Sequence, residues 1–562
     1  MSFKKILLLF FILLAVVGAC FMLFRDVILE QSLLQIQKKI FDKYQVKIEY
    51  RDAGFEGFAR VVINNLSVTP PSGDTLLYCT KTAADISLIR YVKGQPPINN
   101  FLLESGYIHL INKNDSTTNY AFVFNKKKNG EAENTTKTSE KSFSLILGKI
   151  WKNFFDLADF NFQVTDFNIK WLNNNESENV LLEACSLNKT RLNMVATAAQ
   201  ASPGTKWEVI GTVDPKSEIL DLHVGTSNNL VTRVPFFEKI TGIKFFLNSF
   251  GLSLSMHKEN NHTLRFNINA AAVAPGINHW RISPEDVLID SVGVNFKVFV
   301  DDTSFYSGKE SVLIINQLAL LTHLSYSKNI QNRITTVINI NETDAGIFFN
   351  SLPKGLFSTL EKIKISGKIS YKLKLDVNLE VPDSLLFESE LKKSNLKILQ
   401  YGNENFASIN SSFTYTAREK EKVMRVFQVG PENPMFTPIE LINPLLISSV
   451  LTAEDGTFYF HRGFNEEAFR ESMVTNIKEK RFARGGSTIS MQLVKNVFLN
   501  RNKTISRKIE EALIVWLIEN NGIVSKSRML EVYLNIIEWG PGIYGIGEAA
   551  EFYFSKNLFN SI

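Results

Sequence analysis

Strict alternation of apolar and polar side chains is the feature that most constrains the fold of this 562-residue chain. In the longest run, every second residue from Ile369 to Val381 is apolar, and the residues between them are Ser, Lys, Asp, Asn and Glu. This alternation is typical of a strand with one dry face and one wet face. Shorter runs of the same kind occur at residues 62–68, 167–172, 264–269, 294–300 and 337–340. The middle of the chain is therefore predicted to form a long, mainly antiparallel β region.

Two helical patterns and one polar segment accompany these strands. Residues 27–46 have the spacing of an amphipathic helix. Residues 144–160 form a second helical stretch, rich in Leu, Ile, Trp and Phe, which could cap a sheet or touch the membrane; core packing is the favoured role. Residues 125–142 are rich in Lys, Asn, Thr and Glu and have little apolar content, so they are predicted to form a mobile loop.

An uncharged segment near the N-terminus predicts a membrane anchor. The nineteen residues from Ile6 to Phe24 carry no charge, and as a helix they cover about 28 Å, close to the thickness of a bilayer core. The run is long for a cleaved signal peptide, and the four residues ending at Cys20 fit a lipoprotein cleavage site poorly. Lys4 and Lys5 favour a cytoplasmic N-terminus. The rest of the chain is then predicted to lie outside the cytoplasm.

Composition excludes several classes of protein. Hydrophobic residues make up 44% and charged residues 21% of the chain, which is an ordinary globular mixture rather than that of a disordered protein. A net charge of +5 is too dilute to indicate nucleic acid as a partner. Cys20, Cys79 and Cys185 lie far apart and form no zinc-binding motif. Cys79 and Cys185 are the only candidates for a disulfide, and none is predicted.

A helical pattern replaces the alternation from about residue 437, and five short motifs follow one another. They occupy residues 454–463, 485–496, 507–511, 526–535 and 542–556. In order, spacing and content they resemble the peptidoglycan glycosyltransferases of family fifty-one, found in monofunctional transglycosylases and class A penicillin-binding proteins. The resemblance implies a mainly α, lysozyme-like domain that polymerises lipid II into glycan strands, releases undecaprenyl pyrophosphate and inverts the donor linkage.

The residue types in these motifs suit that chemistry. A carboxylate can take the proton from an attacking hydroxyl, and Glu454 is the candidate base. The pyrophosphate leaving group requires cations where charge develops, and residues 478–508 carry nine Lys and Arg against the single acid Glu479. By resemblance, Glu511 is a second carboxylate that assists the leaving group directly or through a divalent cation such as Mg or Mn. The substrate-binding residues that the resemblance implies are Asp455, Phe458, His461, Ser487, Thr488, Gln492, Lys495, Asn496, Arg507 and Lys508, with Lys495, Arg507 and Lys508 on the pyrophosphates.

Several features of this block have alternative interpretations. His461 matches the family's first motif, and the alternative is an ordinary packed histidine. Glu511 follows Arg507 and Lys508 by four and three residues, so an ion pair within one helix is the simpler explanation of their spacing. Residues 464–484 have the pattern of a helix in a membrane interface or of an amphipathic core helix; a lipid-linked substrate favours the interface. Met491 stands where the family usually has Gln, so one hydrogen bond near the donor sugar is in doubt.

The start of the β region carries a looser resemblance. Residues 58–68, just after the anchor helix, are similar to AsmA-like envelope proteins, a likeness of architecture that extends over residues 1–400. It implies a curved β structure whose apolar inner face holds lipid chains. The alternative is that the dry face is the core of a sandwich, and periodicity alone does not distinguish the two.

The predicted fold is thus multidomain α+β. An anchor occupies residues 1–26, an AsmA-like β region residues 27–430 and an incomplete glycosyltransferase domain residues 431–562. The leading hypothesis is an enzyme of the bacterial inner membrane, exposed to the periplasm, whose partners are lipid II, the growing glycan strand, membrane lipids and other cell-wall synthesis proteins. The alternative is a non-enzymatic AsmA-like protein that binds or moves lipid and carries an inactive transferase remnant. This alternative stays open because the family's domain normally continues for several helices after the position that residues 558–562 occupy. A lytic enzyme is less favoured because hydrolysis does not need a basic cluster.

Overall fold

The computed structural model describes residues 3–87, 90, 97–112, 118–124, 142–173, 176–199, 205–329, 331–419 and 422–555, without the side chains of residues 3–23 and of Leu157. The chain divides into two compact units. Unit 1 comprises residues 1–241 and 247–256, and unit 2 comprises residues 242–246 and 257–562.

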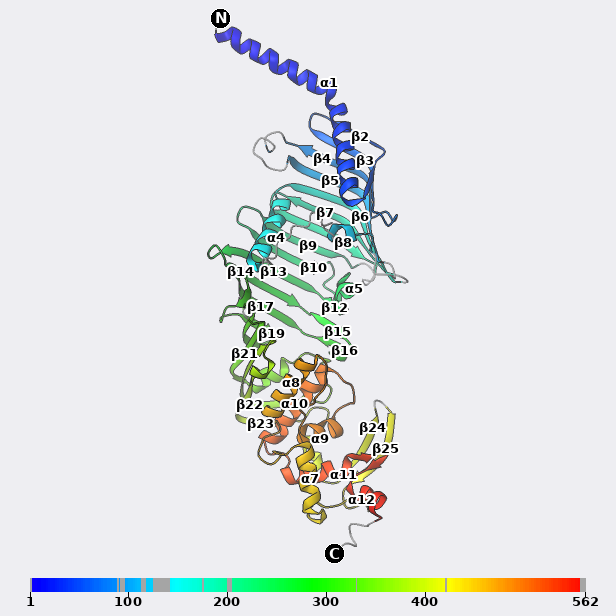
Figure 1. Ribbon diagram of the computed structural model, residues 1–562, viewed down its shortest axis with the longest axis vertical. Coiled ribbons are helices and arrows are strands. Elements are labelled where there is room, and N and C mark those ends of the chain that lie inside the picture. Colours follow the sequence, from blue (N-terminus) through cyan, green and yellow to red (C-terminus); the bar gives the residue numbers. More distant parts are fainter. Residues whose placement is uncertain are drawn as a thin grey trace, which may run out of the picture. The chain divides into compact units, whose positions relative to one another are not determined.

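Unit 1 is a sheet of strands that pair mostly with their neighbours along the chain (Figure 1). Its strands are β1 (Lys47–Glu49), β2 (Asp52–Glu56), β3 (Arg60–Thr69), β4 (Leu77–Ile86), β5 (Ile98–Asn112), β6 (Asn161–Asn173), β7 (Glu176–Asn188), β8 (Arg191–Ala198), β9 (Trp207–Asp214), β10 (Ile219–Thr226) and β13 (Ser249–Lys258). The short strand β11 (Thr232–Arg233) is not part of this sheet. Neighbours pair antiparallel, except that β5 and β6 run parallel. A parallel pair needs a long crossover, and here the crossover contains helix α4 (Phe143–Ala158). The predicted antiparallel β region is confirmed.

Helix α4 confirms the predicted helix at residues 144–160. It begins at Ser142, whose side chain accepts a hydrogen bond from the Leu145 N–H. Trp151 and Phe155 are buried one turn apart on the same face, and the Trp151 indole N–H donates to Glu218 over 2.9 Å. Core packing is therefore the role of this face. Unit 1 also contains the short helices α3 (Ala121–Phe124) and α5 (Phe237–Thr241).

Helix α1 (Phe3–Tyr44) includes both the predicted anchor and the predicted amphipathic helix. The apolar segment 6–24 falls almost wholly on residues whose side chains are not described. Within the part that is described, no helix is long and apolar enough to cross a membrane. The anchor remains a prediction. The predicted mobile loop at residues 125–142 lies, apart from Ser142, outside the described residues.

Unit 2 contains a second group of antiparallel strands. They are β12 (Lys244–Leu247), β14 (Leu264–Val273), β15 (Gly276–His279), β16 (Ser283–Leu288), β17 (Ser291–Val300), β18 (Ser304–Ser307), β19 (Val312–Ile315), β20 (Leu318–Ser327), β21 (Arg333–Asp344), β22 (Lys364–Asn378), β23 (Leu386–Gln400), β24 (Phe413–Glu419) and β25 (Lys422–Val429). β20 to β23 pair in chain order, and β24 and β25 form a separate hairpin. Helix α6 (Ala345–Asn350) follows β21, and single helical turns lie at η1 (Pro382–Ser384) and η2 (Phe406–Asn410).

The longest predicted strand is β22, and its dry face is covered. Residues 379–381 lie beyond its end. Ile369 belongs to the main hydrophobic core of unit 2, and Val377 packs in a smaller cluster with Val474 of helix α8 (Glu466–Glu479). For this strand the dry face is therefore a core, not an open groove.

Helices make up the C-terminal part of unit 2 (Figure 1). Besides α8 and the turn η3 (Ile439–Leu441), they are α7 (Pro444–Glu454), α9 (Ile489–Phe498), α10 (Ile505–Asn520), α11 (Lys526–Ile536) and α12 (Ile546–Phe554), with the short strands β26 (Glu538–Gly540) and β27 (Ile543–Tyr544) before α12. Helices α7 to α11 each begin at an Asn, Thr or Ser whose side chain accepts a backbone N–H of the first turn, so their starts are encoded locally.

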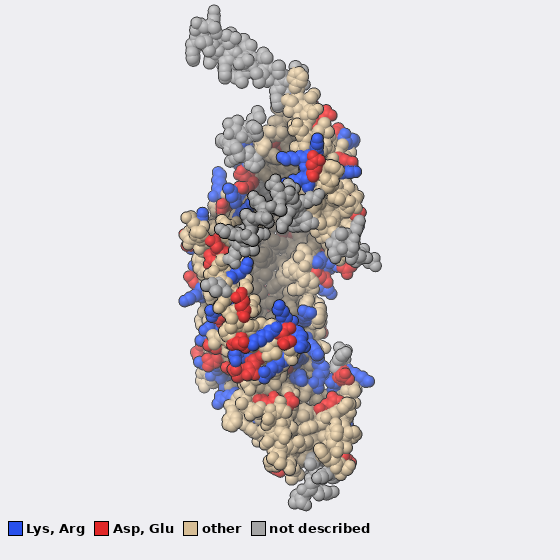
Figure 2. All heavy atoms as spheres, in the orientation of Figure 1, with Lys and Arg blue, Asp and Glu red and all other residues tan. Residues whose placement is uncertain are grey.

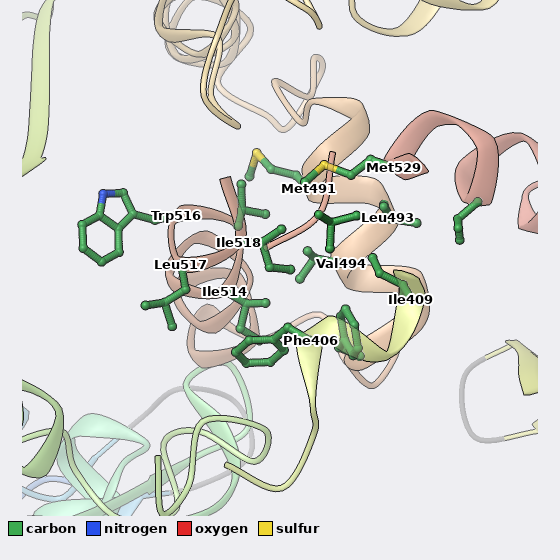
Figure 3. Packing of buried hydrophobic residues seen from close by; sticks show 14 of the residues in the cluster. Phe406, Ile409, Met491, Leu493, Val494, Ile514, Trp516, Leu517, Ile518 and Met529 are labelled. Carbon is green, nitrogen blue, oxygen red and sulfur yellow. The ribbon is translucent and has the colours of Figure 1, made fainter. Parts of the chain in front are cut away.

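One hydrophobic core joins these helices to strands β20–β25. The cluster contains Leu318 and Ile369 from the strands and Ile514, Met529 and Ile546 from the helices. In Figure 3, the η2 side chains Phe406 and Ile409 lie among side chains of α9, α10 and α11. The structure thus divides the chain near residues 242–256, whereas the sequence suggested a boundary at residue 430. The mixed α+β class is confirmed, and the lysozyme-like form of the helical part remains a prediction.

Candidate active site

Glu454, the predicted base, is the last residue of α7 and has an exposed side chain. Its Oε2 accepts a hydrogen bond from Gln492 Nε2 over 2.8 Å. Gln492 Oε1 in turn accepts one from the Tyr533 hydroxyl over 3.3 Å. Burial, with the nearby charges of Glu454 and Asp455, raises the pKa of Tyr533 well above its ordinary value, so the phenol keeps its proton. This chain of hydrogen bonds orients one oxygen of Glu454; no donor among the described residues contacts the other.

The next residue, Asp455, fixes the loop that follows α7. Its buried carboxylate accepts from His461 Nε2 over 2.9 Å and from the backbone N–H of Ile489 over 3.1 Å. His461 Nδ1 accepts from the Gly463 N–H over 3.0 Å, so the ring proton lies on Nε2. Gly463 has a φ of +92°, and a Cβ there would lie 2.4 Å from Val515 Cγ1. Asp455 and His461 therefore hold the first motif against the start of α9.

A cluster of cations forms around Glu511. Glu511 is 1% exposed; its Oε2 accepts from Arg507 Nη1 over 2.6 Å and its Oε1 from Lys508 Nζ over 2.5 Å. The predicted ion pairs within one helix are thus present. Lys495 and Arg501 also lie close by. Among the described residues, only Arg507 and Lys508 pair with Glu511, so these four cations, named here the cation cluster, keep a surplus of positive charge over the one carboxylate.

Lys495 is the least compensated member of the cation cluster. Within the described part of the chain, its ammonium group makes no hydrogen bond or ion pair. Burial and then the positive charge of Arg501 lower the pKa of Lys495, while Glu511 opposes the shift. A half-buried ammonium group beside three other cations favours an anionic ligand.

Helix α9 joins Glu454 to the cation cluster. Gln492, Lys495 and Asn496 are three and four residues apart, so they share one face of this helix. Gln492 contacts Glu454, and Asn496 Oδ1 accepts from Arg501 Nη1 over 2.6 Å. Ser487, just before α9, accepts from Lys508 over 3.0 Å. The structure therefore brings together Glu454, Gln492, Lys495, Asn496, Ser487, Arg507, Lys508 and Glu511 on and around one helix face.

Other predicted site residues have structural roles. Thr488 is 2% exposed; its hydroxyl accepts from the Met491 N–H and donates to the Gly463 carbonyl over 2.7 Å, so it is engaged within the protein. Phe458 is 1% exposed, with Lys526 Nζ 4.3 Å from its ring centroid. Met491 packs in the hydrophobic core beside Met529 (Figure 3).

The basic run 478–508 does not form a single patch. Lys478, Arg481 and Arg484 pair with Asp383, Glu479 and Glu471 on the surface. Figure 2 accordingly shows Lys and Arg side chains mixed with Asp and Glu over the part of unit 2 that contains α8. Such exposed ion pairs contribute little to the free energy of folding. The uncompensated charge belongs to the cation cluster.

The apolar face of α8 is covered by protein. The Phe469 ring lies 4.9 Å from that of Phe387 on β23, and Met473 and Ile477 pack against Val377 and Leu385. The core interpretation therefore holds for α8. Phe482, beyond its C-terminus, is 84% exposed.

Glu511, the carboxylate to which the family resemblance assigns a divalent cation, is engaged by two cationic side chains. Among the described residues, no three His, Cys, Asp or Glu side chains lie close enough together to hold a metal ion. Both oxygens of Glu511 accept hydrogen bonds, from Arg507 and Lys508.

Sequence reasoning missed Tyr533 and Arg501 as parts of this site. Tyr533 is part of helix α11, and its place within the fourth motif was the available signal. Arg501 was counted only as part of the basic run. Other fourth-motif residues are scaffold, since Asn535 exchanges hydrogen bonds with the backbone of Thr437.

Comparison with known proteins agrees with this geometry. Residues 420–560 match the family model described as Transglycosylase. Proteins named biosynthetic peptidoglycan transglycosylase are similar in the same part. The one from Dechloromonas aromatica is 46% identical over 122 residues, which is 22% of this chain and 52% of that protein. The one from Chromobacterium violaceum is 39% identical over 137 residues, which is 24% of this chain and 59% of that protein. The one from Laribacter hongkongensis is 37% identical over 142 residues, which is 25% of this chain and 61% of that protein.

The chain thus spans about half the length of the curated relatives it matches. The match begins at residue 420, so it includes strand β25 as well as the helices. Glu454, the cation cluster and Tyr533 all lie within it.

Proposed function

We propose that this chain is a peptidoglycan glycosyltransferase that polymerises lipid II into glycan strands and releases undecaprenyl pyrophosphate. The observation that carries the proposal is the pairing of an oriented, exposed carboxylate at Glu454 with the cation cluster, joined by one face of α9. Transfer of a sugar from a pyrophosphate needs both groups, because a proton leaves the acceptor while negative charge appears on the donor.

In the proposed reaction, Glu454 takes the proton from the attacking sugar hydroxyl. Gln492 holds Oε2, and no described residue donates to Oε1, which leaves Oε1 to accept the proton. The new carbon–oxygen bond forms as the bond from the sugar to the pyrophosphate breaks. Attack from the face opposite the leaving group inverts the linkage. Lys495, Arg507 and Lys508 stabilise the charge that develops on the departing pyrophosphate.

The role proposed for Glu511 is to orient cations. Its buried carboxylate binds Arg507 and Lys508 at once, from one turn before it on the same helix. A carboxylate held in this way fixes two long, flexible side chains before the substrate arrives, which lowers the entropic cost of ordering them.

The membrane location belongs to the same proposal. The uncharged segment 6–24 and the preceding lysines support a single-pass protein of the inner membrane with its bulk in the periplasm. The sheet of unit 1 supports an AsmA-like region that binds lipid chains. The proposed partners of the whole protein are growing glycan strands, membrane lipids and other cell-wall synthesis proteins.

Synthesis of glycan strands from fluorescent lipid II in detergent, separated on a gel, tests the proposal. We expect ladders from the parent chain and none from Glu454→Gln. Glu466→Gln is the matched control, because Glu466 is an exposed glutamate in the first turn of α8 and makes no described contact. Ladders from Glu454→Gln would remove Glu454 from the role of base.

The other hypotheses give different outcomes in the same experiment. A non-enzymatic lipid-binding protein gives no ladder from parent or variant, although it still binds lipid II. A lytic enzyme releases soluble fragments from purified sacculi instead.

A further inference from the structure

Helix α10 has two functional sides. Arg507, Lys508 and Glu511 take part in the cation cluster. Glu510 is the neighbour of Glu511, and successive residues of a helix point about 100° apart. Glu510 is buried, and its contacts lie in a loop some 150 residues earlier in the chain. One helix therefore links the cation cluster to a distant segment.

The Glu510 carboxylate is held by the loop between α6 and β22. Its Oε1 accepts from the backbone N–H groups of Thr359, over 2.6 Å, and Leu360, over 2.9 Å. Ser358 Oγ lies 3.5 Å from Oε2. Thr359 Oγ1 also donates to the Phe498 carbonyl at the end of α9, over 2.9 Å. The loop thus binds both helices of the candidate site.

Further contacts fix α10 at each end. The N–H groups of Ile505 and Ser506 donate to the carbonyls of Arg281 and Ile282, between β15 and β16, over 2.9 and 3.0 Å. Towards the other end, the Trp516 indole N–H donates to the Leu391 carbonyl of β23 over 3.0 Å. The turn between β15 and β16, the loop 358–360 and strand β23 therefore contact α10 near its start, its middle and its end.

A buried carboxylate is a costly way to fill space. Burial raises the pKa of Glu510, although the backbone N–H groups of Leu360 and Thr359 oppose the shift. An apolar side chain would pack there without that desolvation cost. What a carboxylate adds is direction, because an oxygen that accepts two N–H groups fixes the rotation and height of the helix that carries it.

We propose that Glu510 is a positioning residue, and that the loop 358–360 sets the placement of Arg507, Lys508 and Glu511 through it. The inference rests on the proposed function. It deepens that function because the β strands become part of the catalytic apparatus instead of a spacer. A small shift of α10 misplaces three charged groups together, which is costly where charge develops in the transition state.

Three variants of the full chain separate positioning from simple packing. Glu510→Ala removes the acceptor of two buried N–H groups. Glu510→Gln keeps an oxygen that can accept both, so it is the conservative rescue. Glu551→Ala is the matched control, because Glu551 is an exposed glutamate on α12 whose side chain makes no described contact.

Kinetics of glycan synthesis, normalised to the folded fraction and measured well below the unfolding temperature, provide the first readout. We expect Glu510→Ala to lower kcat about tenfold or more, with KM for lipid II changed much less. Glu510→Gln and Glu551→Ala should stay close to the parent. If Glu510→Ala and the parent have equal kcat per folded molecule, even with a lowered unfolding temperature in the variant, then Glu510 contributes only to packing. That result would overturn the inference.

Hydrogen exchange is the second readout and needs no activity. In Glu510→Ala, the amides of residues 507–511 should exchange faster than in the parent, while those of α12 stay unchanged. Unaltered exchange at 507–511 overturns the inference on its own. If the parent makes no glycan but the exchange result holds, the proposed function fails while the placement of α10 by the loop stands.

Discussion

Lys495 is the residue where charge and burial conflict most within the site. Its ammonium group is half-buried beside three other cations, and this lowers its pKa from the ordinary value of 10.5. A bound pyrophosphate supplies negative charge and raises the pKa again. Binding therefore takes up a proton above the lowered pKa, and affinity should fall as the pH rises from that value towards 10.5.

The prediction is tested with Lys495→Met and inorganic pyrophosphate. Affinity measured by calorimetry at neutral pH should fall about tenfold, which corresponds to ~1.4 kcal/mol, and its alkaline pH dependence should flatten. Lys503→Met is the control, because Lys503 is exposed in the same basic run. An unchanged affinity in Lys495→Met would exclude this lysine from the anion site.

At the residue scale, the sequence predicted the chemistry better than the contacts. Glu454 could be named as the candidate base because proton transfer needs a carboxylate, whereas Lys495 and Glu511 were named from the family resemblance. The sequence did not show that the Thr488 hydroxyl has a partner within the protein, because that partner, the Gly463 carbonyl, lies 25 residues earlier in the chain. Tyr533 was missed because its partner, Gln492, is 41 residues away.

At the scale of the element, Thr488 determines where α9 begins. Thr488→Ala removes both the cap of Met491 N–H and the bond to Gly463, so we expect the unfolding free energy to fall by about 1–2 kcal/mol. Thr488→Ser should retain most of the unfolding free energy of the parent, because its hydroxyl can make the same two hydrogen bonds. Thermal unfolding of the full-length variants measures the effect. A stable Thr488→Ala protein with weakened lipid II binding would instead support the substrate contact that the sequence suggested.

Element types were predictable, but their partners were not. The alternation in residues 369–381 indicated a strand with one dry face, and β22 is that strand. Periodicity does not say what covers a dry face, and here α8, about 100 residues later, covers part of it. For the same reason α8 could be interpreted equally well as a membrane-interface helix or a core helix.

At the scale of the whole molecule, strands and helices of unit 2 share a core. Phe406 is fully buried between them, with its ring 5.5 Å from that of Phe498. Phe406→Ala should lower the unfolding free energy by about 3–5 kcal/mol. Protease cleavage sites should then open in β22 and α10 together. Phe482→Ala, at an 84% exposed position, should change stability by less than ~0.5 kcal/mol. Cleavage in α10 alone would show that the helices unfold separately.

The predicted boundary at residue 430 lies near the start of the family match at residue 420, whereas the two compact units divide near residues 242–256. The change from alternation to a helical pattern is real, and it occurs there. A change of secondary structure is a local property, whereas a unit is defined by contacts such as those between Glu510 and Thr359, which local patterns do not encode.

The start of α10 has a consequence for how an anion is recognised. The N-terminus of a helix commonly binds phosphate with its free backbone N–H groups. In α10 the first four are already engaged, by Arg281, Ile282 and Thr504. The N–H groups at the positive end of this helix dipole therefore already donate to protein oxygens, so a phosphate in the cation cluster is held by side chains, with the charge supplied by ammonium and guanidinium groups. Recognition of that kind tolerates varied phosphate positions and weakens steeply as salt is added.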